Sequence, residues 1–220
     1  FSKFDGRPPA AMNEVAMTFI CPAAEHDITK YSMQKRYAVR ETPALYSAAT
    51  VPFIDAIPEK QCSWVKNCVV DRTKEQDKLL YEDDGCMMFP DTKWDLKDLE
   101  TLHTLAIFKD PSVRSVRDLR GQHLPLLKQL RAGCLAELRT RYGVSPASLR
   151  VFMHYLPSFW WAHVHFSALT CPAMGSTTSV GKAILLDDII DNLERDASYY
   201  ETASLSFVVG DREPLYKLLR

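Results

Sequence analysis

Three of the six histidines of the chain lie within one short stretch, at His154, His163 and His165. Imidazole exchanges protons near neutral pH, and its neutral form is a nucleophile and a metal ligand. Alternate residues of a strand point to the same face, so a strand predicted over 160–170 places His163 and His165 side by side. A preceding strand over 149–155 would bring His154 to them. The spacing therefore predicts a cluster of imidazoles.

Three interpretations of this cluster follow from the residues alone. A His-x-His motif is often a hydrogen-bonded pair in a protein core. A zinc site needs three or four ligands, and no carboxylate or thiolate stands at ligand spacing near His154, His163 and His165. We therefore rank a metal site below nucleophilic catalysis, and expect neither a metal nor another cofactor.

The residues around the histidines extend the pattern, because 154–158 reads His-Tyr-Leu-Pro-Ser and 163–166 reads His-Val-His-Phe. These motifs resemble the histidine-triad superfamily and, within it, the scavenger mRNA decapping enzymes. Further segments are similar to that family in the same order: Cys21-Pro22-Ala23-Ala24-Glu25, Arg40-Glu41-Thr42, Pro90-Asp91-Thr92-Lys93-Trp94, Ser115-Val116-Arg117-Asp118-Leu119, His123-Leu124-Pro125-Leu126-Leu127 and Pro214-Leu215-Tyr216-Lys217-Leu218-Leu219. The resemblance covers nearly the whole chain and is weak at residues 1–12.

The resemblance implies hydrolysis of the triphosphate bridge in 7-methylguanosine cap dinucleotides or short capped oligonucleotides during mRNA decay. His163 would be the nucleophile, and a phosphohistidine would form before water releases 7-methylguanosine monophosphate. His154 and His165 would stabilise charge on the phosphate oxygens, helped by Ser158. The implied partners are capped dinucleotides or short capped RNA and, in a homodimer, a second copy of the chain.

The resemblance also implies a site for the methylated base. Trp64 would stack on the cationic ring, although on the residues alone it reads as a core tryptophan of a helix. Glu75 would accept hydrogen bonds from the base edge. Asp91 and Lys93 would contact the nucleoside and its nearest phosphate.

A smaller N-terminal domain closes over the phosphates in this family. Lys30 and Tyr31 resemble a Lys-Tyr pair of that domain, so the resemblance implies that both would contact the triphosphate bridge when the lid closes. Without the resemblance, both would be ordinary surface residues of a helix.

The chain departs from the family at three positions. Trp161 stands where relatives have the first histidine of the triad, Phe159 where they have tyrosine, and Thr92 where they have a leucine that packs on the base. An active variant, a weakened enzyme and a cap-binding paralogue all fit these changes, and we favour the first. Another histidine-triad nucleotide hydrolase is a further alternative, against which Trp64 and Glu75 argue.

The pattern of apolar residues predicts an α+β protein, with helices on one side of an antiparallel sheet, as in the histidine-triad fold. A hairpin turn is expected at Asp83-Asp84-Gly85. The expected strands are 15–21, 37–41, 77–82, 86–89, 149–155, 160–170 and 204–209, and the expected helices are 23–35, 63–70, 96–108, 124–142, 181–195 and the C-terminal segment.

Three parts are expected along the chain. Residues 1–42 would be a remnant of the N-terminal lid and dimerisation domain. Residues 43–61 contain three prolines and would form a hinge, and residues 62–220 would form the catalytic domain. Since the chain opens on Phe1, we expect it to be a fragment or a trimmed form.

The composition limits the classes of partner that we expect the protein to bind. The chain of 220 residues carries a net charge of −1, which argues against long duplex nucleic acid, because such ligands select a basic surface. No apolar run reaches the roughly 20 residues of a membrane helix, so no membrane partner is expected. The six cysteines form no Cys-x-x-Cys pair and fit reduced thiols. We expect a cytoplasmic and nuclear protein.

Overall fold

The computed structural model describes residues 20–25, 34–92, 94–171 and 178–220. The chain divides into two compact units, 1–34 and 35–220. Most of the strand expected over 15–21 and most of the helix expected over 23–35 lie outside the described residues, and so do the predicted site residues Lys30, Tyr31 and Lys93. The proposed lid therefore stays a prediction.

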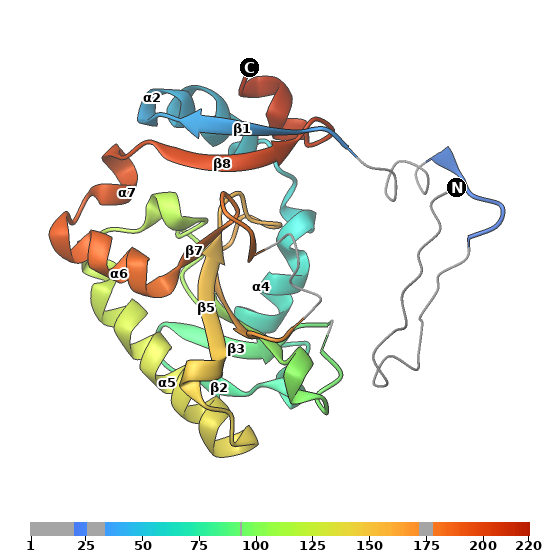
Figure 1. The fold of residues 1–220 in the computed structure, drawn as a ribbon, viewed down its shortest axis with the longest axis vertical. Helices are drawn as coiled ribbons and strands as arrows, with labels where there is room; N and C mark the ends of the chain where they lie inside the picture. The colour runs from blue at the N-terminus through green and yellow to red at the C-terminus, as the bar shows by residue number, and fades with distance from the viewer. Residues whose placement is uncertain (1–19, 26–33, 93, 172–177) are drawn as a thin grey trace, which may run out of the picture. The chain divides into compact units, whose positions relative to one another are not determined.

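The second unit contains two antiparallel sheets (Figure 1). In the smaller sheet, β1 (Arg36–Glu41) pairs with β8 (Leu205–Gly210). The larger sheet has the strand order β2-β3-β4-β6-β5-β7. Its strands are β2 (Tyr81–Glu82), β3 (Cys86–Pro90), β4 (His103–Phe108), β5 (Leu149–His154), β6 (His163–Ala168) and β7 (Ala183–Leu185). The predicted α+β class is confirmed, and so is the hairpin between β2 and β3.

Strand β6 lies inside the larger sheet, between β4 and β5, and every one of its residues is buried. Residues 161–166 point alternately to the two faces of the sheet, and each face carries its own apolar cluster. Val164 and Phe166 belong to the main core, whereas Trp161, just before the strand, belongs to a second core on the opposite face. Because His163 and His165 alternate with Val164 and Phe166, they face the second core.

Helices cover both faces of the larger sheet, so the expectation of helices on one side was wrong. On one face, α5 (Leu124–Tyr142) and α6 (Leu186–Arg195) pack on the main core (Figure 1). On the other, α4 (Ser63–Val69) packs Val65, Cys68 and Val69 against β3 and β4. Both faces of β3 and β4 are apolar, and a sheet buried on both sides requires cover on both. Helix α4 thereby borders the histidine face.

The segment 96–108 is not the helix that its leucine spacing predicted. Leu96 has a positive φ of 65°, a 3₁₀ turn follows at Leu99–Thr101, and 103–108 is strand β4. The β-branched Thr104 and Ile107 favour a strand. Pairing with β3 and β6 on either side then decides the outcome.

Among the remaining helices, one has the predicted bounds and others differ from their predicted bounds or type. Helix α5 has the predicted bounds, and Gly143 ends it with a left-handed φ of 69°. The helix expected over 181–195 begins only at Leu186, because 183–185 form β7. The C-terminal helix is a 3₁₀ helix, Pro214–Leu218, and α7 spans Tyr199–Thr202.

The segment expected to act as a hinge is largely helical. It holds α2 (Pro43–Leu45), a π-helical turn (Tyr46–Thr50), α3 (Val51–Asp55) and a 3₁₀ turn (Glu59–Cys62). Thr42 caps α2 through a hydrogen bond from the Leu45 amide to its hydroxyl. Further 3₁₀ turns are Gln76–Lys78, Val116–Asp118, Gly121–His123 and Pro146–Ser148.

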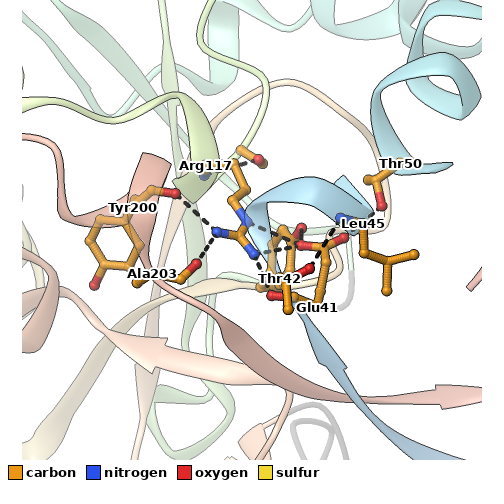
Figure 2. Close-up of polar contacts among 9 residues, drawn as sticks. Glu41, Thr42, Leu45, Thr50, Arg117, Tyr200 and Ala203 are labelled. Carbon is orange, nitrogen blue, oxygen red and sulfur yellow. Dashed lines mark hydrogen bonds and ion pairs between the residues drawn. The ribbon is translucent and has the colours of Figure 1, made fainter. Parts of the chain in front are cut away.

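A buried ion pair connects the smaller sheet to the rest of the unit (Figure 2). Arg117 donates from Nε and an amino group to the Glu41 carboxylate at 3.0 and 2.8 Å. Its remaining N–H groups reach the carbonyls of Glu41, Tyr200 and Ala203. The hydroxyls of Thr50 and Tyr155 also donate to Glu41. Two segments that carried the family resemblance, around Glu41 and Arg117, thus meet in space.

The cysteines are free thiols, as expected, and four of them are buried. In the described part of the chain, no helix is both long enough and apolar enough to cross a membrane.

Candidate functional site

The structure brings together the three histidines singled out in the sequence. His154, from the end of β5, and His163 and His165, from β6, have ring nitrogens within 4.8 Å of one another. The ring of His165 lies 4.2 Å from that of His154 and 4.9 Å from that of His163. All three are buried. Because a buried polar group is costly to leave without a partner, the partners of the ring nitrogens determine where each imidazole carries its proton.

His163 is held with its proton on Nδ1. That nitrogen lies 2.7 Å from the backbone carbonyl oxygen of Trp161, and a carbonyl only accepts, so Nδ1 must donate. Burial lowers the pKa of His163 to about 4, partly offset by the same hydrogen bond. At neutral pH the ring is therefore uncharged, and Nε2 carries the lone pair. A neutral imidazole with this tautomer is a nucleophile.

His165 is bonded to a fourth histidine that sequence analysis did not single out. Its Nδ1 lies 3.0 Å from Nε2 of His103, and its ring stacks on Phe152 at 4.9 Å. His103 escaped notice because 96–108 was interpreted as a helix. Read as a strand, the segment places His103 on the same face as Leu105 and Ile107, toward the cluster.

Asp91 lies behind His103. Its Oδ1 is 3.6 Å from His103 Nδ1, and its amide N–H donates to the His103 carbonyl at 2.9 Å. The position follows from strand pairing, because Asp91 comes directly after β3 and β3 pairs with β4. Asp91 is thereby placed beside the histidine cluster.

Trp161, which replaces the expected first triad histidine, takes a structural place. Its indole N–H donates to the carbonyl of Phe108 at 2.8 Å. The ring is buried among residues of the second core, beneath α4. The side chain therefore fills space beside the cluster, and its backbone carbonyl orients His163.

An aromatic path connects His163 to the surface. The ring of Phe159 stacks on His163 at 4.1 Å and 13°, and the ring of Trp64 meets Phe159 edge-on at 5.0 Å. Trp64 is 42% exposed, so it is not the core tryptophan that its helix alone suggested. Only the Phe159 ring separates the exposed indole of Trp64 from the imidazole of His163. A nucleotide whose base stacks on the indole could therefore bring its phosphate to the imidazole.

Two predicted residues lie on the surface, outside the buried cluster. Ser158 is exposed in the loop between β5 and β6. Glu75 is exposed, has a positive φ of 58° and pairs with Lys78 at 2.6 Å. The side-chain amide of Gln76 ties this turn to α4 by donating to the Cys68 carbonyl at 2.8 Å. Glu75 is therefore held near the helix that carries Trp64.

The histidine cluster also has the dimensions of a three-ligand metal site. His163 and His165 each engage Nδ1 in the bonds described above, so an ion would have to be held through their Nε2 atoms. The same Nε2 atoms are those that phosphate chemistry would need. The expectation that no metal is required stays a prediction.

The chain matches known proteins along its whole length. Residues 63–181 match the family described as scavenger mRNA decapping enzyme C-term binding. The chain is 38% identical over 225 residues to the m7GpppX diphosphatase of Bos taurus, aligning all of this chain with 65% of that protein. It is 36% identical over 213 residues to the m7GpppX diphosphatase of Ascaris suum, covering 95% of this chain and 69% of that one.

Among solved structures, the aprataxin orthologue Hnt3 from Schizosaccharomyces pombe aligns with a TM-score of 0.42 and 17% identity, over 70% of this chain and 89% of that one. This likeness is too distant to bear on function. The curated relatives are much closer, and the chain spans about two thirds of their length. The family match and these identities show that the chain belongs to the scavenger mRNA decapping enzyme family.

Proposed function

We propose that this chain hydrolyses the triphosphate bridge of 7-methylguanosine cap dinucleotides and short capped oligonucleotides, releasing 7-methylguanosine monophosphate in mRNA decay. One observation carries the proposal: His163 is buried, neutral and protonated on Nδ1, within a cluster that includes His154 and His165. The relatives named m7GpppX diphosphatase supply the substrate class.

The reaction runs in two displacements at phosphorus. Nε2 of His163 attacks the phosphate attached to 7-methylguanosine, the bond to the bridging oxygen breaks, and the remaining nucleoside diphosphate leaves. Water then attacks the phosphohistidine, the P–N bond breaks, and the imidazole is regenerated. His154 and His165 donate to the oxygens on which charge develops. These donors take the place that a metal ion has in many phosphoryl transfers.

The methylated base is recognised at α4. The exposed face of Trp64 attracts the cationic ring, an interaction worth ~2 kcal/mol or more when desolvated. Glu75 accepts hydrogen bonds from the base edge, and Asp91 and Lys93 contact the nucleoside and its phosphate. The aromatic path through Phe159 supports this placement, because it sets the stacking surface one ring from His163.

The wider arrangement is proposed on the resemblance alone. The functional unit would be a homodimer whose smaller domains close over the bridge, with Lys30 and Tyr31 contacting its phosphates. The protein would act in the cytoplasm and the nucleus.

The test is chromatographic detection of products from a methylated cap dinucleotide, without added metal, beside the unmethylated analogue. We expect 7-methylguanosine monophosphate from the methylated substrate, and none with the His163→Asn variant. A variant that turns over as fast as the parent would refute His163 as nucleophile. Equal rates on both caps would favour a different histidine-triad hydrolase.

A second candidate function is cap binding without turnover. It is favoured by Phe159, whose ring lies against the His163 ring, and by the absence of a histidine at position 161. Quenching of Trp64 fluorescence by the methylated cap, without any product, would establish this alternative.

A further inference from the structure

We propose that His103 is a positioning residue of the active site, which fixes the tautomer and orientation of His165 by linking it to the Asp91 carboxylate. The proposal rests on the proposed cap hydrolysis and adds a member to its machinery. Neither the triad motif nor the cap-site motifs include His103.

The sheet brings His103 to His165. Strand β4 pairs with β6 in a register that sets Leu105 opposite His165 and His103 opposite Ser167. His103 and His165 are therefore diagonal neighbours on one face, within reach of each other. Their rings stand nearly parallel, 5.2 Å apart and inclined by 20°, with Nε2 and Nδ1 at 3.0 Å.

The bond between two imidazole nitrogens requires one proton between them. The Asp91 carboxylate, 3.6 Å from His103 Nδ1, favours a proton on that nitrogen. In neutral His103 the other nitrogen, Nε2, then accepts, so the shared proton belongs to Nδ1 of His165. With Nδ1 committed in this way, any bond from His165 to a phosphate oxygen must be made by Nε2.

The arrangement has a consequence for charge as well as orientation. If His165 donates Nε2–H to a phosphate oxygen while Nδ1–H is retained, its ring is positively charged. The hydrogen bond to a neutral His103, and the electrostatic contact of His103 with Asp91, then set that charge against the Asp91 carboxylate. An imidazolium held in this way stabilises negative charge developing on the phosphate.

A role in packing alone does not account for this residue. His103 is 2% exposed in a strand whose neighbours on the same face, Leu105 and Ile107, are apolar. An aliphatic side chain would fill the position without burying two ring nitrogens, which is costly unless they are bonded. The ring instead makes polar contacts within the site: a hydrogen bond to His165 at 3.0 Å and an electrostatic contact with the Asp91 carboxylate at 3.6 Å.

The test compares three variants of the full chain with the methylated cap dinucleotide. His103→Phe keeps a ring but removes both nitrogens, and we expect kcat to fall on the order of 100-fold, with KM within about threefold, as for a lost acid–base group. His103→Gln, whose Oε1 reaches the place of Nε2 and accepts from His165, should recover most of kcat. Thr104→Val, on the opposite face of β4, is the control and should keep the parent rate.

The tautomer of His165 gives a readout that packing would not move. Nitrogen-15 NMR of the imidazole rings should show the proton of neutral His165 on Nδ1 in the parent and in His103→Gln, and a mixture or the other tautomer in His103→Phe. Parent kcat in His103→Phe, or an Nε2–H tautomer in the parent, would overturn the proposal. The tautomer of His165 in the parent protein tests the proposal even if His103→Phe does not fold.

Failure of the two proposals can be told apart. A parent protein without cap hydrolysis contradicts the proposed function, whatever the state of His103. Hydrolysis by the parent together with an unchanged His165 tautomer in His103→Phe contradicts only the role of His103.

Discussion

At the scale of single residues, a backbone atom at position 161 orients His163 in the proposed site. The carbonyl of Trp161 accepts the Nδ1 proton of His163, and any residue at 161 supplies a carbonyl. The indole ring is occupied elsewhere, in its bond to Phe108 and in the second core. The tautomer of His163 therefore does not depend on the side chain at position 161, so tryptophan there is compatible with the proposed nucleophile.

Substitution of Trp161 by histidine tests this reasoning. Because the carbonyl is kept, we expect kcat for the methylated cap to stay within about tenfold of the parent. The smaller ring leaves space beneath α4, so the free energy of unfolding should fall by roughly 2 kcal/mol. Steady-state kinetics and urea unfolding measure the two effects. A rise of kcat well beyond tenfold would show that the indole suppresses the chemistry.

The pKa of His163 predicts a loss of stability in acid. Burial lowers it to about 4 from 6.5, so between these values the unfolded chain binds a proton that the folded chain does not. The free energy of unfolding then decreases as pH falls from about 6.5 toward 4. At pH 5 the contribution is about 2 kcal/mol.

The His163→Asn variant is the control for that measurement, because asparagine does not titrate. Urea unfolding at pH 7 and pH 5 should show a larger decrease for the parent than for the variant. Equal decreases would contradict the assignment of a low pKa to this imidazole.

At the scale of elements, the packing of α4 sets the exposure of Trp64, the proposed stacking residue. The helix buries Val65, Cys68 and Val69 against the sheet, which leaves Trp64 on its outer side, 42% exposed. The ring thereby faces solvent beside Phe159. An amphipathic helix of seven residues thus covers the sheet and, in the proposed function, also presents the stacking surface.

Truncation of Trp64 should weaken binding of the methylated cap. With the indole worth ~2 kcal/mol, Trp64→Ala should raise the dissociation constant by roughly 30-fold, and should affect the unmethylated cap less. Val70→Ala, at an exposed residue just beyond the same helix, should change neither. Titration calorimetry with the His163→Asn background avoids turnover. An equal effect on both caps would contradict recognition of the cationic ring.

The sequence predicted those elements whose pattern is local and unambiguous. Helix α5, its glycine cap and the strand carrying His163 and His165 follow from spacing alone. Strand β4 did not, because leucines at 96, 99, 102 and 105 match a helical stripe while pairing with β3 and β6 comes from residues far along the chain. That error concealed His103, so the triad was predicted and the residue behind it was missed.

At the scale of the whole molecule, the Glu41–Arg117 pair connects elements that the sequence separates widely. All five N–H groups of Arg117 are bonded, and both side chains are buried. The carboxylate also accepts from Tyr155, the residue after His154. This buried network connects the smaller sheet to the end of β5, the strand that carries His154.

Removal of one partner of this pair should be strongly destabilising. Arg117→Met leaves the Glu41 carboxylate buried without its counter-charge, so the free energy of unfolding should fall by about 3–5 kcal/mol. Arg114→Met, which breaks an exposed pair with Asp55 in the same segment, should cost less than about 1 kcal/mol. Urea unfolding compares them. Equal costs would contradict the special contribution of the buried pair.

The pairing of β1 with β8 bears on how the protein is made. These strands lie at opposite ends of the second unit, so the smaller sheet cannot close until residues 205–210 have been synthesised. The hydrogen bonds within helix α5 and within the β2–β3 hairpin join nearby residues, so these bonds can form earlier. Contacts of such long separation are the slow step of folding. During synthesis, Glu41 therefore stays exposed to water until β8 has been made and pairs with β1.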